Sequence, residues 1–173
     1  MAKRTLSPGA LRRLCTEESR MKNDCKGCGF EASPSIVGGE KDYTQWDVYI
    51  TGPGDSLYEN CILHAILIFD YNYPLVPPKM KFVTEMFHPN IFKDGNVCIS
   101  ILHMASDDPT SYEKPDENWT PVQNIRTVVL SVISMLNEPN INSPANVDAS
   151  KLFKNAYEEY CEKVKELMKA QKK

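Results

Sequence analysis

The sequence lacks a long apolar run and an excess of positive charge, and each absence excludes a class of protein. The apolar stretch Ile66-Leu67-Ile68-Phe69 is far too short to cross a bilayer, which takes about 20 residues. A formal net charge of -3 gives no general attraction to nucleic acid. The first residues, Met1-Ala2-Lys3-Arg4-Thr5, lack the apolar centre of a secretory signal. We therefore expect an intracellular protein with no membrane segment and no nucleic-acid partner.

A second pair of closely spaced cysteines is also missing. The six cysteines include one CxxC pair, Cys25 and Cys28. A structural zinc site takes four ligands, typically from two such pairs, so we expect no metal site. A redox pair would be expected at a helix start that follows a strand, whereas this pair follows a predicted helix. Without a secretory signal, the cysteines indicate a reducing compartment.

What is present is the composition of one globular domain. The 173 residues are 42% hydrophobic and 25% charged, which predicts a single domain over 1–173. Apolar residues Trp46, Val48 and Ile50 alternate with polar ones, as in a sheet with one solvated face. The most uniformly apolar segment, 62–69, should be a central strand of the sheet. Short linkers favour an antiparallel meander of four strands, at 30–36, 45–51, 62–69 and 79–83.

Helices are predicted before the first strand and after the last strand of the chain. Ser7-Pro8 is a capped helix start, followed by an apolar stripe of Leu11, Leu14, Cys15 and Met21. Thr120-Pro121-Val122-Gln123 predicts the start of a buried central helix, with Thr120 as its N-cap and Gln123 completing a capping box. Two C-terminal helices follow from residue 147. The predicted fold class is α+β.

Cys98 is the best candidate nucleophile. An Asp94-Gly95 turn precedes it, and Val97 and Ile99 should face the opposite side of an extended segment from Cys98. A cysteine in this pattern is equally compatible with a small buried hydrophobic residue. Asn90 lies eight positions earlier (98 minus 90) beside a proline. Its amide could stabilise an oxyanion but cannot act as a base, and asparagine in a turn also caps backbone groups.

These residues together resemble the ubiquitin-conjugating enzymes over residues 7 to 173. The resemblance includes the spacing from Asn90 to Cys98 and the order of three short motifs: Tyr73-Pro74-Leu75-Val76-Pro77-Pro78-Lys79, His88-Pro89-Asn90 and Trp119-Thr120-Pro121. It implies a fold with an N-terminal helix, a four-stranded antiparallel meander sheet, a central buried helix and C-terminal helices.

The separation between Cys98 and Trp119 indicates a subclass. These residues are 21 positions apart (119 minus 98), and an acidic insertion occupies about 103–118. The chain resembles family members that have an acidic insertion after the catalytic cysteine. Those relatives build lysine-48-linked chains in protein quality control and cell-cycle degradation. The resemblance implies a cytoplasmic protein, with the nucleus or recruitment to the endoplasmic reticulum surface as further locations.

The resemblance also implies a mechanism. Cys98 would accept ubiquitin as a thioester from an activating enzyme, and a lysine would then attack that thioester with a RING-type ligase bound. Asn90 would organise the site and stabilise the oxyanion, while His88 would shape the turn. No tightly bound cofactor is expected, because ATP is consumed upstream by the activating enzyme. A thiolate is a good nucleophile and leaving group, which fits this two-step transfer.

The insertion itself is rich in acids. Between 107 and 118 it contains one base, Lys114, and five acids: Asp107, Asp108, Glu113, Asp116 and Glu117. Such a loop is either a solvated segment or a surface that attracts a lysine or a basic face of ubiquitin. Because acids favour the charged, non-nucleophilic form of lysine, we assign them positioning rather than base chemistry. His103 could be a local acid or base, or a structural residue. Ser143 stands where many relatives carry an acid.

Partner surfaces follow from the same resemblance. Arg12 and Arg13 match the face that docks the activating enzyme, and Leu75, Trp119 and Pro121 match the ligase-contact loops. Surface arginines and loop prolines can equally have no partner. Three alternatives remain open: a conjugating enzyme for another ubiquitin-like modifier, a non-catalytic ubiquitin-binding scaffold, and a cysteine hydrolase using His88 or His103. Catalytically silent relatives lack the cysteine, so Cys98 argues against the scaffold.

Overall fold

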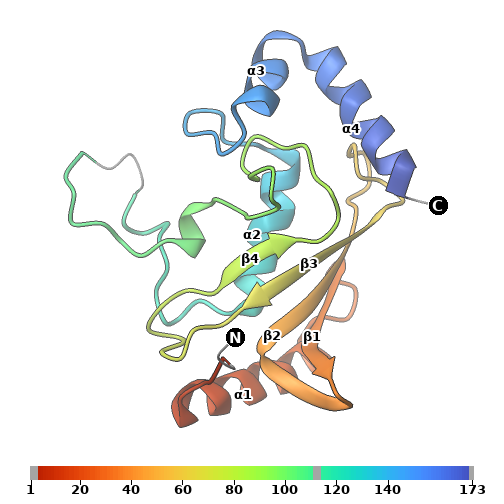
Figure 1. Ribbon diagram of the computed structural model, residues 1–173. Helices are drawn as coiled ribbons and strands as arrows, with labels where there is room; N and C mark the ends of the chain where they lie inside the picture. The colour runs from red at the N-terminus through yellow and green to blue at the C-terminus, as the bar shows by residue number, and fades with distance from the viewer. Residues whose placement is uncertain (1–3, 111–113, 172–173) are drawn as a thin grey trace.

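The structure is a computed structural model that describes residues 4–110 and 114–171, and this part contains four α-helices and one sheet (Figure 1). The predicted α+β class is confirmed. The elements in chain order are α1 (Pro8–Asp24), β1 (Phe30–Val37), β2 (Glu40–Thr51), β3 (Ile62–Ile68), β4 (Lys79–Phe82), the 3-10 turn η1 (Ser100–Leu102), α2 (Ile125–Asn137), α3 (Val147–Asn155) and α4 (Tyr157–Gln171).

The sheet is the predicted antiparallel meander, in the order β1-β2-β3-β4. Trp46, Val48 and Ile50 are fully buried, as their alternation with polar residues predicted. The third strand lies between β2 and β4, as expected, although Ile62 on its other face is largely exposed. The second strand begins five residues earlier than predicted (45 minus 40), because its first residues pair with the end of β1 beyond an irregularity at Pro34.

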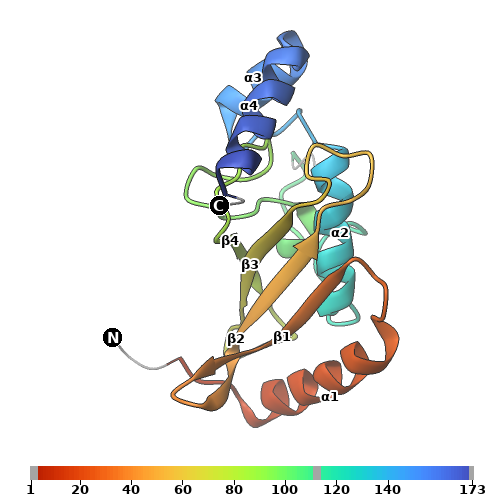
Figure 2. The ribbon, with the colours of Figure 1, turned by 90° about the vertical axis from the view of Figure 1, so that its right-hand side faces the viewer.

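Helix α2 covers the inner face of the sheet (Figure 2). Six of its side chains are buried: Ile125, Val128, Val129, Val132, Met135 and Leu136. The predicted start at Thr120 is wrong. Asn124 is the N-cap, and Thr127 completes a capping box with it. Residues 120–122 are exposed instead, and Val122, which the predicted start placed inside the buried helix, is 82% exposed.

The buried face of α1 differs from the predicted apolar stripe. It consists of Ala10, Leu14, Glu17 and Glu18, whereas Leu11 and Cys15 are exposed. The two carboxylates can be buried because each has partners across the fold. Glu18 accepts hydrogen bonds from Lys41 at 2.7 Å and Tyr43 at 2.6 Å. An apolar stripe could not reveal this face, since half of its residues are acidic.

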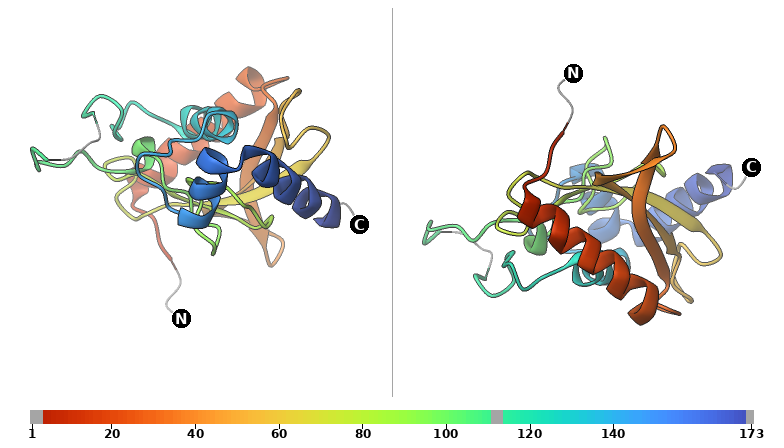
Figure 3. Two further views of the ribbon diagram at one scale, coloured as in Figure 1. Left: turned by 90° about the horizontal axis from the view of Figure 1, so that it is seen from above. Right: turned by 90° about the horizontal axis from the view of Figure 1, so that it is seen from below.

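Helices α3 and α4 lie at the opposite end of the molecule from α1 (Figures 1 and 2). The described parts of the insertion, 103–110 and 114–118, contain no helix and no named strand, as predicted, and they extend away from the sheet and helices (Figure 3). Within the described residues, no helix is both long and apolar enough to cross a bilayer. The segment that carries Cys98 lies between the end of β4 and the start of the insertion.

Candidate active site

The site is built on a buried histidine turn that follows β4. His88 is fully buried, and its Nε2 donates to the carbonyl of Met135 in α2 at 2.9 Å. Its Nδ1 accepts from the amide of Asn90 at 3.0 Å. Burial lowers the pKa of His88 to about 4, so the ring is neutral at pH 7 and can donate at one nitrogen and accept at the other. The His88 ring therefore links this turn to α2.

Cys98 is held against this turn by its backbone. Its amide donates to the carbonyl of Asn90 at 2.9 Å, and the amide of Val97 donates to the carbonyl of Met80 in β4 at 2.9 Å. The connecting turn contains Gly95 at φ 94°, and a Cβ atom there would lie 2.3 Å from the carbonyl oxygen of Phe82. Val97 is buried, as an inward-facing residue should be, whereas Ile99 and Cys98 are both half-buried. The thiol therefore stands on a fixed backbone within reach of solvent.

The Asn90 side chain joins the histidine turn to the segment before α3. Asn90 is 2% exposed, its Nδ2 donates to the carbonyl of Asn140 at 2.7 Å, and its Oδ1 accepts from the Asn140 amide at 2.8 Å. The carbonyl of Pro89 accepts from the amides of Ala145 and Asn146. These bonds fix both ends of the segment that carries the exposed Ser143. Since an amide nitrogen carries two protons, Asn90 can still donate one more hydrogen bond.

His103 returns to Cys98 through the short turn η1. The His103 Nε2 and Cys98 Sγ atoms are 3.9 Å apart, and the imidazole is half-buried. The amide of Trp119 donates to the carbonyl of His103 at 2.8 Å, and Met104 forms a parallel bridge with Trp119. The two ends of the acidic insertion are therefore joined at the residue that contacts the thiol. The insertion is structurally part of the site.

The described acids of the insertion fall into two groups. Asp107 and Asp108 are exposed, and Asp108 accepts from the Thr110 amide and hydroxyl, which lowers its pKa. Asp116 and Glu117 line a pocket together with Ile99, Ser100 and Ile101, the residues directly after Cys98. Glu113 lies outside the described residues. The second group therefore lies beside the segment that follows Cys98.

The predicted partner residues differ in their surroundings. Arg12 is exposed on α1, but the Arg13 side chain is only 28% exposed and is hydrogen bonded to the turn before α2. Leu75 is 67% exposed, and Pro121 is also exposed. Trp119 is buried and donates from Nε1 to the carbonyl of Pro74 at 2.8 Å. Trp119 therefore holds the loop of Leu75 through its bond to Pro74 instead of offering an exposed surface.

Two residues of this region escaped prediction. Asn140 supplies the backbone partner of Asn90, and Glu17 supplies a buried carboxylate beneath the turn before α2. The only sequence signal for Glu17 is its i,i+4 spacing from Arg13. All six cysteines lie in described residues and none forms a disulfide. Within the same residues, no cluster of three potential metal ligands is present.

Comparison with known proteins agrees with this arrangement. The sequence model of the ubiquitin-conjugating enzymes matches residues 13–168. A probable ubiquitin-conjugating enzyme E2 7 of Caenorhabditis elegans is 54% identical over 125 residues, which cover 72% of this chain and 76% of the relative. The E2-18 kDa enzyme of Schizosaccharomyces pombe is 47% identical over 158 residues, 91% and 93% of the two chains.

The human ubiquitin-conjugating enzyme E2 G2 is 45% identical over 162 residues, which cover 92% of this chain and 94% of the relative. The acidic insertion after Cys98 is consistent with likeness to E2 G2. The family match covers most of the chain, and the described sheet and helices have the order that the motifs implied. The chain belongs to the ubiquitin-conjugating enzyme family, whose members are transferases that act through a cysteine thioester.

Proposed function

We propose that Cys98 accepts ubiquitin as a thioester and passes it to a lysine, building lysine-48 chains that direct proteins to the proteasome. The observation that carries this proposal is the placement of Cys98. Its amide is fixed by the Asn90 carbonyl, and its half-buried sulfur lies 3.9 Å from the His103 ring. The segment lies within the match to the family.

The proposed reaction consists of two acyl transfers. In the first, the Cys98 thiolate attacks the thioester carbonyl of ubiquitin carried by the activating enzyme. The new bond from Sγ to the carbonyl carbon forms, and the thiolate of the activating enzyme leaves. In the second, a neutral lysine amine attacks the same carbonyl, the Cys98 thiolate leaves, and the amine loses a proton as the isopeptide forms. Each step passes through an oxyanion, so a hydrogen-bond donor at the carbonyl oxygen accelerates both.

Asn90 is the proposed donor to this oxyanion. Its remaining amide proton suits that role, and its two bonds to Asn140 hold the amide in one orientation. A fixed donor is more effective than a mobile one because it needs no reorganisation when charge develops. One side chain can thus both hold the Asn140 backbone and donate to the oxyanion.

The insertion and its neighbours would receive the acceptor lysine. Exposed carboxylates at Asp107, Asp108, Asp116 and Glu117 would attract the ammonium group or a basic face of ubiquitin. They would also favour the charged amine, so they position the lysine without activating it. Among the residues proposed for this site, the His103 imidazole can take up the amine proton, whereas a serine hydroxyl such as that of Ser143 is a poor base.

The proposed partners are ubiquitin, an activating enzyme, a RING-type ligase and substrate proteins. Arg12 would contact the activating enzyme, and exposed Leu75 and Pro121 would contact the ligase. ATP is consumed by the activating enzyme, and we do not propose that this chain binds it. The proposed location is the cytoplasm, with the nucleus and the endoplasmic reticulum surface as further sites of recruitment.

The test is formation of a reducible adduct in a mixture of the protein, ATP, activating enzyme and ubiquitin. Cys98→Ser should trap an ester that resists thiols and is cleaved by hydroxylamine, and Cys98→Ala should give no adduct. A reducible adduct on Cys98→Ala would contradict the assignment of the nucleophile. An adduct that forms with another ubiquitin-like modifier, but not with ubiquitin, would support the alternative modifier. Linkage is read by mass spectrometry of the chains.

A further inference from the structure

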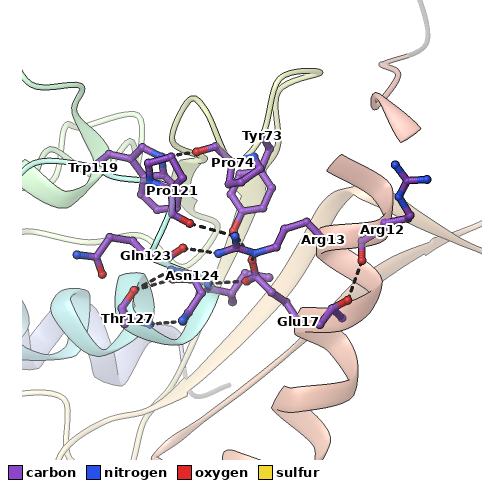
Figure 4. Close-up of polar contacts among 12 residues, drawn as sticks. Arg12, Arg13, Glu17, Tyr73, Pro74, Trp119, Pro121, Gln123, Asn124 and Thr127 are labelled. Atoms are coloured by element: carbon purple, nitrogen blue, oxygen red, sulfur yellow. Dashed lines mark hydrogen bonds and ion pairs between the residues drawn. The ribbon is translucent and has the colours of Figure 1, made fainter. Parts of the chain in front are cut away.

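Arg13 and Glu17 form a polar network that joins α1 to the turn before α2 (Figure 4). Arg13 donates from Nη1 to the carbonyl of Pro121 at 3.0 Å and from Nη2 to the carbonyl of Gln123 at 2.7 Å. Its Nε donates to Glu17 Oε1 at 2.7 Å. The planar guanidinium therefore holds two carbonyls of one short turn and a carboxylate at the same time, a geometry that lysine cannot reproduce.

Glu17 is the buried centre of this network. It is 3% exposed, and its Oε2 accepts from the amide of Ile125, the first residue of α2, at 2.8 Å. Its Oε1 also accepts from the Tyr73 hydroxyl at 2.6 Å. Burial and the adjacent carboxylate raise the pKa of Tyr73, so the phenol remains a donor at neutral pH. A carboxylate at this depth is tolerated because each oxygen is hydrogen bonded and a guanidinium balances its charge.

The same network also fixes the turn that carries Leu75. The Tyr73 ring packs on Trp119 at 5.8 Å between centroids, and Trp119 donates to the carbonyl of Pro74. Two exposed apolar surfaces, Leu75 in one turn and Pro121-Val122 in the other, are therefore both positioned by the Glu17 carboxylate. In Figure 4 the adjacent Arg12 points away from this cluster.

We propose that Arg13 and Glu17 are positioning residues for the ligase-contact surface formed by Leu75, Pro121 and Val122. This role of Arg13 differs from the docking of the activating enzyme that the sequence resemblance implied, because the N–H groups of Arg13 are directed to the turn before α2. Three of its five N–H groups donate to intramolecular acceptors, so two remain for a partner. This inference rests on the proposed function, since it concerns how the ligase is bound.

The test is single-turnover discharge of the ubiquitin-charged protein to lysine, titrated with an isolated RING domain that stimulates the wild-type protein. Arg13→Ala should raise the RING concentration for half-maximal stimulation about tenfold, as expected when hydrogen bonds to a charged group are lost. The rate at saturating RING domain should change much less. Arg13→Lys should behave like Arg13→Ala, because it keeps the charge and loses the fork. Arg20→Ala, an exposed arginine on the same helix, is the matched control.

Two results would overturn the inference. One is a half-maximal RING concentration for Arg13→Ala and Arg13→Lys equal to that of Arg20→Ala, with more activating enzyme required for charging; this would show a docking role. The other is a lower saturating rate that follows a lower melting temperature, with no change in half-maximal concentration; this would show a purely structural role. A wild-type protein that accepts no ubiquitin, or that no RING domain stimulates, would instead refute the proposed function and the inference together.

Discussion

Replacing Asn90 separates bracing from catalysis. Asn90→Ala removes both hydrogen bonds to the Asn140 backbone. Each bond contributes about 0.5–1.5 kcal/mol net, and a buried polar group left without a partner costs about 1–3 kcal/mol. Asn140 is exposed, so water can replace part of what its backbone loses. We therefore expect the free energy of unfolding to fall by roughly 1–3 kcal/mol.

A loss of this size leaves the domain folded, since a typical domain has about 5–15 kcal/mol of stability. Any large fall in rate under native conditions is then chemical. Removing one oxyanion donor typically slows a reaction by about 10²–10³-fold. We expect the single-turnover discharge of ubiquitin to free lysine to slow by at least ~10²-fold in Asn90→Ala. Urea unfolding of the same samples measures the bracing contribution separately.

Asn90→Asp is the companion variant. It retains the acceptor for the Asn140 amide but loses the donor and places a negative charge beside the developing oxyanion. Discharge should therefore be at least as slow as in Asn90→Ala, although one brace is kept. A discharge rate within about threefold of wild type in Asn90→Ala, with stability lowered, would refute the oxyanion role. Unchanged stability would refute the bracing account.

Three further predictions follow from the geometry. Burial lowers the pKa of His88 to about 4, below its value in the unfolded chain. As the pH falls, His88 is therefore protonated in the unfolded chain before it is protonated in the folded protein. The free energy of unfolding should fall by about 3 kcal/mol from pH 6.5 to pH 4. Urea unfolding should show that His88→Gln flattens this fall, and an equally steep fall in the variant would contradict it. Deleting 106–117 should impair chain building more than thioester charging, and equal loss of both in single-turnover assays would argue against the positioning role. Gly95→Ala should cost about 1–3 kcal/mol, because its Cβ meets the Phe82 carbonyl and its φ is positive; an unchanged denaturation midpoint would show that the turn can relax.

Local periodicity predicted the sheet because the information lies within each strand. Trp46, Val48 and Ile50 alternate with polar residues, and that pattern alone defines a buried face. The start of α2 could not be predicted in this way. Thr120-Pro121 is a valid helix signal, but Arg13 binds the carbonyls of Pro121 and Gln123 from 108 and 110 positions away. A non-local interaction of this kind leaves no local pattern.

In the candidate site, too, local motifs were predictable from the sequence and long-range partners were not. Cys98 and the His88-Pro89-Asn90 turn were predicted from short motifs and their spacing. The partner of Asn90 was not, because Asn140 contributes its backbone, which has no residue-type signature, from 50 positions away. Asp116 and Glu117 were indistinguishable from the other acids by composition. Only the folded chain shows that these two line the pocket beside Ile99 and Ser100.

Helix α2 has a mechanical consequence for the protein. Glu17 binds the amide of Ile125 near its start, and His88 binds the carbonyl of Met135 near its end. These two positions are ten residues apart (135 minus 125), roughly 15 Å along a helix axis. A partner that shifted the helix along this axis would have to break the His88 bond or move the turn before Cys98 with it. Helix α2 thus rigidly connects the proposed ligase-contact surface to the turn that precedes Cys98.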